Sequence, residues 1–308
     1  MSNLTQRVLV ALITIPLIVT LSIFGGFYFF GMIVFIASLG LYEYYKLAGA
    51  KGAFPQTLVG LVFGFFVCSV FIWEKLQTPI ASLSPMLGCY VPNLSMSELL
   101  LALLLSFIPL ILLIELFRNR GSAIVNSATT IVGVVYVSLF LGSFVGLREL
   151  FAQKAFTAPQ FPDVVGSTAV QYSWGGTIVL TVFVSIWMCD SLAYFAGRLL
   201  GKHKLFERVS PNKTWEGAIA GYVGAVATFL VSQHYFLSFM SVGSALACGS
   251  IVGIFGQLGD LAESLLKRDA GVKDSSALIP GHGGVLDRFD SLLFVSPLLY
   301  LYLRFVVF

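Results

Sequence analysis

Long apolar runs alternate with short polar segments along the whole chain, and this pattern predicts a polytopic membrane protein. A helix that crosses a bilayer needs about 20 consecutive apolar residues. Nine stretches approach this length, at 8–24, 27–47, 58–73, 99–117, 124–147, 176–200, 217–239, 242–266 and 291–308. The sequence therefore predicts an all-α bundle of about nine transmembrane helices.

The composition supports a membrane protein. Hydrophobic residues make up 57% of the chain and charged residues only 11%, which is outside the range of ordinary soluble domains. Arg7 followed by an apolar run is also typical of a signal peptide, but no small-residue cleavage motif follows Pro16 and the second span begins at once. We therefore expect the first two spans to be a retained hairpin.

The distribution of basic residues predicts the orientation in the membrane. Nine spans place the termini on opposite sides, and a cytoplasmic N-terminus puts all but four of the 18 Lys and Arg residues inside. The four outside are Lys75, Arg148, Lys154 and Arg304. Because cytoplasmic loops carry the basic excess, we expect an integral protein, of a bacterial inner (plasma) membrane, with its long polar loops in the cytoplasm. Nothing in the chain predicts a nucleic-acid partner.

Ionisable residues divide the chain into two regions. Residues 1–150 have few of them within the spans, and this region is interpreted as a transmembrane scaffold. In residues 174–308 every span adjoins a polar motif, and two polar loops face the predicted cytoplasm. We expect the chemistry in this second region, because charged groups at membrane depth usually face a bundle interior or a wet cavity.

The first candidate is Asp190, in the middle of the span 176–200. An unpaired carboxylate is costly there. It is either a packing residue paired with a neighbouring polar group or a metal or substrate ligand.

The second candidate is the polar loop 201–214 and the helix start that follows it. Lys213 and Thr214 at a helix N-terminus provide a cation, a hydroxyl and free N–H groups, which suit a phosphate. The same sequence, with Glu216 in the first turn, is also explained by simple helix capping. The loop residues with binding potential are Ser210, Asn212, Lys213 and Thr214.

The third candidate is a polar helix face in the span 242–266 and just beyond it. Asp260, Ser264 and Lys267 fall at positions i, i+4 and i+7 and so share that face. Glu263 forms an i, i+4 pair with Lys267, and a bundle-stabilising ion pair explains it. Asp260 is not explained unless another segment supplies a cation.

The fourth candidate is the glycine-rich segment before the last span. His282, Gly283 and Gly284 lead into Asp287, Arg288 and Asp290. Glycines let backbone N–H groups approach an anion, and clustered carboxylates bind magnesium. A glycine turn followed by an acidic helix start would explain either aspartate alone.

Together these groups place acids and cations at one membrane face, which is typical of nucleotidyl or phosphoryl transfer. That chemistry depends on positioning and on neutralising phosphate charge.

Three stretches, 190–198, 210–217 and 264–290, resemble the phosphatidate cytidylyltransferase family, also called CDP-diacylglycerol synthases. The longest has the full family pattern: Ser264, Lys267, Arg268, Lys273, Asp274, Ser276, Ile279, Pro280, His282, Gly283, Gly284, Asp287, Arg288 and Asp290. Ser191 stands where the family more often has Thr. The first 150 residues resemble the family only in being hydrophobic.

The resemblance implies an integral membrane enzyme that joins CTP to phosphatidic acid with Mg²⁺, leaving a second cation and a homodimer as open alternatives. On this basis we expect catalytic roles for Asp260, Lys267, Asp287 and Arg288. The expected metal ligands are Asp260, Asp287, Asp290 and Asp190. The expected substrate-binding residues are Ser210, Asn212, Lys213, Thr214, Ser264, Arg268, Lys273, His282, Gly283 and Gly284.

Other functions stay open at this point. An ion-coupled transporter also places carboxylates such as Asp190 and Asp260 in a bundle, although its site would lie near the midplane. A polyprenol or phytol kinase, or a synthase acting on ether lipids, shares the phosphate chemistry without the full terminal motif. A purely structural scaffold would gain nothing from so many costly ions.

Overall fold

The computed structural model of the chain describes residues 3–87, 94–152, 168–279 and 283–308, and these residues form a helical bundle. In chain order the elements are α1 (Asn3–Phe24), α2 (Gly26–Ala50), α3 (Thr57–Val70), α4 (Trp73–Leu87), α5 (Met96–Arg118), α6 (Ala123–Gly133), the π-helical turn η1 (Val134–Leu139), α7 (Phe140–Glu149), α8 (Thr168–Leu200), β1 (Lys204–Phe206), β2 (Ser210–Thr214), α9 (Trp215–Tyr235), α10 (Val242–Asp269), α11 (Leu286–Tyr302) and the π-helical turn η2 (Leu303–Val307). The predicted all-α membrane fold is confirmed.

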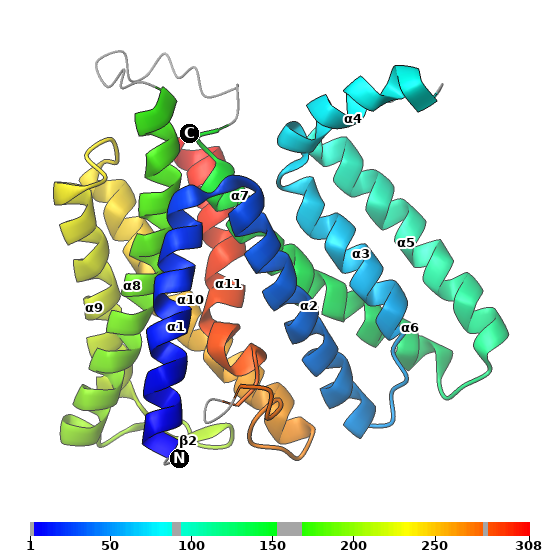
Figure 1. The fold of residues 1–308 in the computed structure, drawn as a ribbon. Helices are drawn as coiled ribbons and strands as arrows, with labels where there is room; N and C mark the ends of the chain where they lie inside the picture. The colour runs from blue at the N-terminus through cyan, green and yellow to red at the C-terminus, as the bar shows by residue number, and fades with distance from the viewer. Residues whose placement is uncertain (1–2, 88–93, 153–167, 280–282) are drawn as a thin grey trace.

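The number of membrane-crossing helices is seven in the described part of the chain, or eight if a broken pair counts as one span. That pair is Thr57–Val70 and Trp73–Ser82, which meet at 95°. The first predicted span corresponds to the shorter apolar helix Val8–Phe24. The count of nine and the sides of the two termini therefore stay predictions, although Figure 1 shows the termini at opposite ends of the bundle.

The helices form two groups that meet along the middle of the molecule (Figure 1). In the first group α8 packs on α9, α9 on α10, and α10 on α11, while α1 lies against α8. In the second, α3 packs on α5 and on η1. The groups are joined because α2 contacts α3 and α7, and α7 in turn contacts α8 and α11. Segments distant in sequence thus share one interior.

Glycines allow the helices of the first group to approach closely. A Cβ on Gly217 of α9 would lie 2.6 Å from the carbonyl oxygen of Ala193 on α8. A Cβ on Gly259 of α10 would lie 2.6 Å from the carbonyl oxygen of Asp290 on α11. Small residues are the usual means of close packing between membrane helices. Here Gly217 brings α9 close to α8, and Gly259 brings α10 close to α11 beside Asp290.

The polar loops lie at one end of the bundle, which we call the loop face (Figure 1). It contains the antiparallel hairpin β1–β2, in which Lys204 pairs with Thr214 and Phe206 with Ser210. It also contains the described residues between α10 and α11, 270–279 and 283–285, which we call the signature loop. The predicted association of the two polar loops at one membrane face is thus present in the fold.

A buried polar network closes the opposite end of the bundle. Arg148, fully buried at the end of α7, donates to the carbonyl oxygens of Ser22 at 2.7 Å and Ile23 at 2.8 Å. Its guanidinium lies 4.2 Å from the centre of the Tyr172 ring. Glu149 accepts a hydrogen bond from the backbone N–H of Gly26 at 2.7 Å. Arg148 therefore satisfies the free carbonyl groups at the C-terminal end of α1, which would otherwise be unpaired beside lipid.

Candidate active site

Asp260 receives the cation that the sequence alone did not supply. The Nζ of Lys213, on β2, lies 2.6 Å from Oδ2 of Asp260, on α10. The hydroxyl of Ser264, one turn further along α10, donates to Oδ1 of Asp260 at 3.3 Å. The hairpin therefore meets the polar face of α10. The sequence spacing predicted that Asp260, Ser264 and Lys267 share this face, but it did not predict the contact with the hairpin.

Thr214 explains why Lys213 points inward. Its side-chain oxygen accepts a hydrogen bond from the backbone N–H of Gly217 at 3.2 Å and caps α9. The capping explanation is thus confirmed for Thr214. Because the cap fixes the end of β2 at the helix start, the preceding residue, Lys213, is held toward α10. Ser210, at the other end of β2, is half-buried, and Asn212, in the middle of the strand, is exposed.

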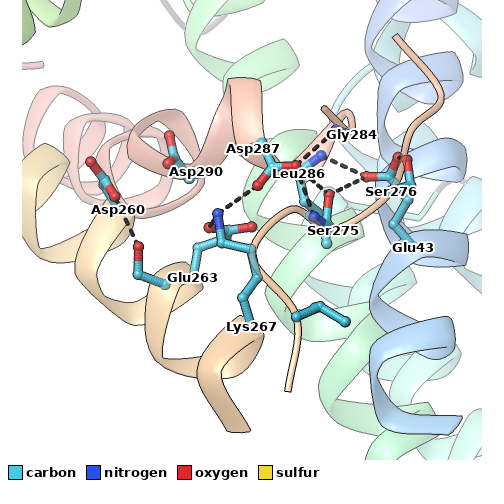
Figure 2. Close-up of polar contacts among 12 residues, drawn as sticks. Glu43, Asp260, Glu263, Lys267, Ser275, Ser276, Gly284, Leu286, Asp287 and Asp290 are labelled. Carbon is cyan, nitrogen blue, oxygen red and sulfur yellow. Dashed lines mark hydrogen bonds and ion pairs between the residues drawn. The ribbon is translucent and has the colours of Figure 1, made fainter. Parts of the chain in front are cut away.

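Three carboxylates gather around Lys213, and we call Asp190, Asp260 and Asp290 the acidic cluster. Each interacts electrostatically with another member, and Lys213 interacts with all three. Figure 2 shows Asp260 on α10 beside Asp290 on α11. The close approach of the two helices at Gly259 produces this proximity. When all are ionised, three negative charges share one positive charge.

Lys267, further along α10, contacts a second group of acids. Its Nζ lies 2.5 Å from Oε2 of Glu263 and 2.5 Å from Oδ1 of Asp287. Glu263 is fully buried and Lys267 is 8% exposed. The predicted i, i+4 ion pair of Glu263 with Lys267 is confirmed. The structure adds Asp287 as a second partner, so that two buried carboxylates share one lysine (Figure 2).

Asp287 also organises the signature loop. Its Oδ2 accepts hydrogen bonds from the backbone N–H and the hydroxyl of Ser275, at 2.9 and 2.8 Å, and from the backbone N–H of Gly284 at 2.8 Å. Gly283 has a positive φ of 79°, a conformation that glycine adopts at little cost. Asp287 is therefore held by the loop and by Lys267, whereas Asp260 and Asp290 lie in the acidic cluster. The structure places the four predicted metal ligands in two environments.

Glu43, on α2, is a site residue that the sequence interpretation did not select. It is 2% exposed and accepts hydrogen bonds from the hydroxyls of Ser276 at 2.5 Å and Ser275 at 3.1 Å. It also accepts from the backbone N–H groups of Val285 at 3.0 Å and Leu286 at 2.8 Å. Figure 2 shows Glu43 beside Ser275, Ser276 and Leu286. The first 150 residues therefore contribute directly to the signature loop.

A signal for Glu43 was present in the sequence. It is a carboxylate inside an apolar span, and such residues are functional candidates by default. Its partners could not be inferred, because they lie more than 230 positions away and two of them are backbone groups.

Several predicted residues are exposed on the loop face. Arg268 is exposed and donates to the carbonyl oxygen of Val272 at 3.1 Å. Lys273 and Arg288 are exposed as well. His282 lies outside the described residues.

The described side chains do not by themselves form a complete metal site. In the part of the chain that the structure describes, no three His, Cys, Asp or Glu side chains converge closely enough to hold a metal ion. Magnesium is usually bound by one or two carboxylates together with substrate phosphates and water, rather than by an all-protein cage. Asp260 and Asp290 are two neighbouring carboxylates, which would match that smaller number. The metal therefore stays a prediction.

Comparison with known proteins relates the chain to a single family of enzymes. The model of a family described as "Cytidylyltransferase family" matches residues 5–306. A phosphatidate cytidylyltransferase of Synechocystis sp. is 32% identical over 96% of this chain and 95% of the relative. A phosphatidate cytidylyltransferase of Staphylococcus haemolyticus is 37% identical over 74% of this chain and 76% of the relative. One from Staphylococcus aureus is 50% identical over a shorter region, 39% of this chain and 46% of the relative.

Proposed function

The chain belongs to the cytidylyltransferase family, and from this premise we propose that it transfers the cytidylyl group of CTP to phosphatidate. The products are CDP-diacylglycerol and pyrophosphate. An oxygen of the lipid phosphate attacks the α-phosphorus of CTP, a new P–O–P linkage forms, and the bond from the α-phosphorus to the oxygen bridging to the β-phosphate breaks. The lipid phosphate already carries an ionised oxygen, so the attack needs no protein base.

The observation that best supports this chemistry within the site is the charge of the acidic cluster. Asp190, Asp260 and Asp290 share one cation, Lys213. Carboxylates near a membrane interior require compensating positive charge. We propose that Mg²⁺ supplies it, held by Asp260 and Asp290, with Asp190 nearby and a second cation as a further possibility. When bound, Mg²⁺ would offset the negative charge of the phosphate groups.

Asp287 has a different role in the proposed site. It stays a predicted metal ligand, but its two oxygens already bind Lys267, Ser275 and Gly284. In this state Asp287 orders the signature loop against α10. Lys267 and Asp287 thus act on the site by fixing the loop that carries the glycines and leads into Arg288 on α11.

The cations of the loop face are proposed to hold CTP and the leaving pyrophosphate. Lys213 lies beside Asp260, where it would contact phosphate oxygens of CTP. Arg268, Lys273 and Arg288 are exposed on the loop face, in reach of a ligand arriving from the aqueous side. Because phosphoryl chemistry is catalysed mainly by positioning and charge neutralisation, these residues need not transfer protons.

The orientation completes the proposal. CTP is a water-soluble nucleotide of the cytoplasm, and the basic excess of the polar loops is typical of the cytoplasmic side. We propose that the loop face is cytoplasmic and that the protein lies in the bacterial inner membrane. We also propose that the protein forms a homodimer, which cross-linking in native membranes would test.

The decisive experiment uses the full chain purified in detergent. Incubation with CTP, Mg²⁺ and phosphatidate should give CDP-diacylglycerol and pyrophosphate. Asp260→Asn should lose at least about 100-fold in turnover, as expected when a group that stabilises the charge of the transition state is removed. Asp269→Asn, on the same helix and exposed, is the matched control. Product formation by folded Asp260→Asn at the wild-type rate would overturn the proposed site.

A further inference from the structure

A cavity on the loop face lies apart from the residues described above. Its volume is about 200 Å³, and it lies between the C-terminal ends of α2 and α5 and the loops that follow them. Its polar and aromatic lining comprises Tyr42, Tyr45, Lys46, Phe54, Arg118 and Arg120. None of these residues belongs to the acidic cluster or to the signature loop.

The cavity is strongly cationic. Lys46, Arg118 and Arg120 line it, and no carboxylate is found among its described lining residues. Of these three residues, Arg118 forms an ion pair, at 2.5 Å, with Glu115, which is not a lining residue. Among the described residues, no ion pair involves Lys46 or Arg120. The cavity thus has positive charge that the protein itself does not neutralise.

Aromatic rings hold the two outer cations in place. The Nζ of Lys46 lies 4.9 Å from the centre of the Tyr42 ring, and the guanidinium of Arg120 lies 4.6 Å from the centre of the Phe54 ring. Such contacts orient a cation without neutralising it. Lys46 and Arg120 therefore keep their charge available to an anion.

The walls are fixed by a buried hydrogen-bond network. Asn126, which is fully buried, accepts from the backbone N–H of Phe54 at 2.7 Å and donates to the carbonyl oxygen of Arg120 at 2.7 Å. It also donates to Glu115 at 3.2 Å. Arg118 donates to the carbonyl oxygen of Phe54 at 3.0 Å. One side chain thus ties together the two loops that form the cavity, which is preorganised rather than induced by a ligand.

We propose that this cavity binds the phosphate of an anionic phospholipid headgroup. The cations lie at the ends of two helices that are long and apolar enough to cross the membrane, which is the depth of the lipid phosphates. Basic pockets between transmembrane helices are suited to anionic headgroups. The apolar surface of α5, with Leu112, Leu113 and Leu116 exposed, would run beside the acyl chains of the same lipid.

The test uses full-length protein in detergent and counts bound lipids by native mass spectrometry. Phosphatidylglycerol and phosphatidylcholine of identical acyl chains are compared. The double variant Lys46→Gln/Arg120→Gln removes both cations that have no described ion-pair partner and leaves the Arg118–Glu115 pair intact. We expect about 30-fold weaker binding of phosphatidylglycerol to the variant, from the usual contribution of two cations near an anionic lipid surface. Binding of phosphatidylcholine should not change.

Two further variants control for charge and for folding. Lys51→Gln removes a neighbouring cation of the same face that pairs with Asp269 outside the cavity, and it should bind phosphatidylglycerol as the wild type does. Lys46→Arg/Arg120→Lys keeps both positive charges. Its affinity for phosphatidylglycerol should stay within about threefold of the wild type, because binding depends on positive charge near the membrane surface. If the neutral double variant fails to fold, Arg120→Gln alone is compared with Arg120→Lys.

Several outcomes would overturn the proposal. Equal binding of the two lipids by the wild type would show that the cavity does not select an anionic headgroup. Unchanged phosphatidylglycerol binding by the folded neutral variant would place the lipid elsewhere. Displacement of the lipid by millimolar inorganic phosphate or CTP would assign the cavity to a soluble phosphate instead.

Discussion

The carboxylate of Glu43 on α2 accepts a hydrogen bond from the backbone N–H of Leu286 at 2.8 Å, across 243 positions of sequence. Leu286 is the first residue of α11. The same carboxylate accepts three more hydrogen bonds from the signature loop and the helix start. Negative charge at a helix N-terminus is favourable. Glu43 is therefore the group that positions α11, and with it Asp287 and Asp290.

Glu43→Gln tests this positioning role. Gln keeps the size of the side chain, but it replaces one acceptor oxygen by a donor that faces N–H and hydroxyl groups. We expect a loss of about 2–4 kcal/mol in the free energy of unfolding, because charged hydrogen bonds are lost in a buried site. Hydrogen exchange of residues 283–288 should accelerate. Glu74→Gln, exposed on α4, is the control, and unchanged exchange in Glu43→Gln would contradict the role.

Lys267→Met tests the shared lysine. Removing it leaves Glu263 and Asp287 as two buried carboxylates without their cation. Breaking a buried ion pair typically costs about 3–5 kcal/mol, so thermal unfolding in detergent should occur at a clearly lower temperature. Adding Glu263→Gln to this variant should recover part of the stability but not the activity.

The matched control for that prediction is Lys51→Met. Lys51 pairs with Asp269 at 3.4 Å, and both side chains are more than half exposed. Exposed pairs contribute about 0–1 kcal/mol. Equal destabilisation by the two substitutions would show that Lys267 has no special function in the bundle.

Lys213→Gln tests the cation of the acidic cluster. Without Lys213, three carboxylates face one another and the proposed contact to phosphate is lost. We expect kcat/KM for CTP to fall about 100-fold, as when one charged group that stabilises the transition state is removed. Lys204→Gln is the control, because Lys204 lies on the same hairpin but donates to the carbonyl oxygen of Pro211. Similar losses in both variants would point to hairpin disruption instead.

Gly259→Ala tests the close approach of α10 and α11. The added methyl group would lie 2.6 Å from the carbonyl oxygen of Asp290, so the helices must separate. Overpacking of this kind costs about 1–3 kcal/mol, and activity should fall because Asp260 and Asp290 move apart. Gly243→Ala, at the start of α10, meets only the Ser241 hydroxyl at 3.8 Å. Equal activity of the two variants would show that the separation of Asp260 and Asp290 is unimportant.

Arg148→Lys tests the network at the opposite end of the bundle. Lys keeps the charge but cannot reach the carbonyl oxygens of Ser22 and Ile23 together in the geometry of a guanidinium. We expect stability to fall by about 2–4 kcal/mol, the scale for breaking a buried charged network. The KM for CTP should not change, because Arg148 lies at the far end of α7 from the loop face. A raised KM with normal stability would contradict this structural role.

Much of the site could be predicted because the chemistry of membrane-embedded charge is local. Asp190, Asp260, Lys267, Asp287 and Asp290 were selected from the cost of placing charge beside lipid and from helical spacing. The i, i+4 partnership of Glu263 with Lys267 also follows from spacing alone, and the structure contains it. The apolar runs likewise predicted the all-α membrane fold, because backbone groups in lipid must be satisfied within the helix.

The partners of these charges were decided only by tertiary structure. The sequence placed Lys213 and Asp260 in separate segments, and the packing of α9 against α10 brought them together. The partners of Glu43 include backbone N–H groups, which carry no residue-specific signal. Local spacing determines which side chains share a helix face, whereas contacts between helices depend on crossing geometry and close packing. The sequence by itself therefore determined most of the charged groups of the candidate site, with Glu43 as the exception, and the packing of α2, α10 and α11 decided which of them lie in contact.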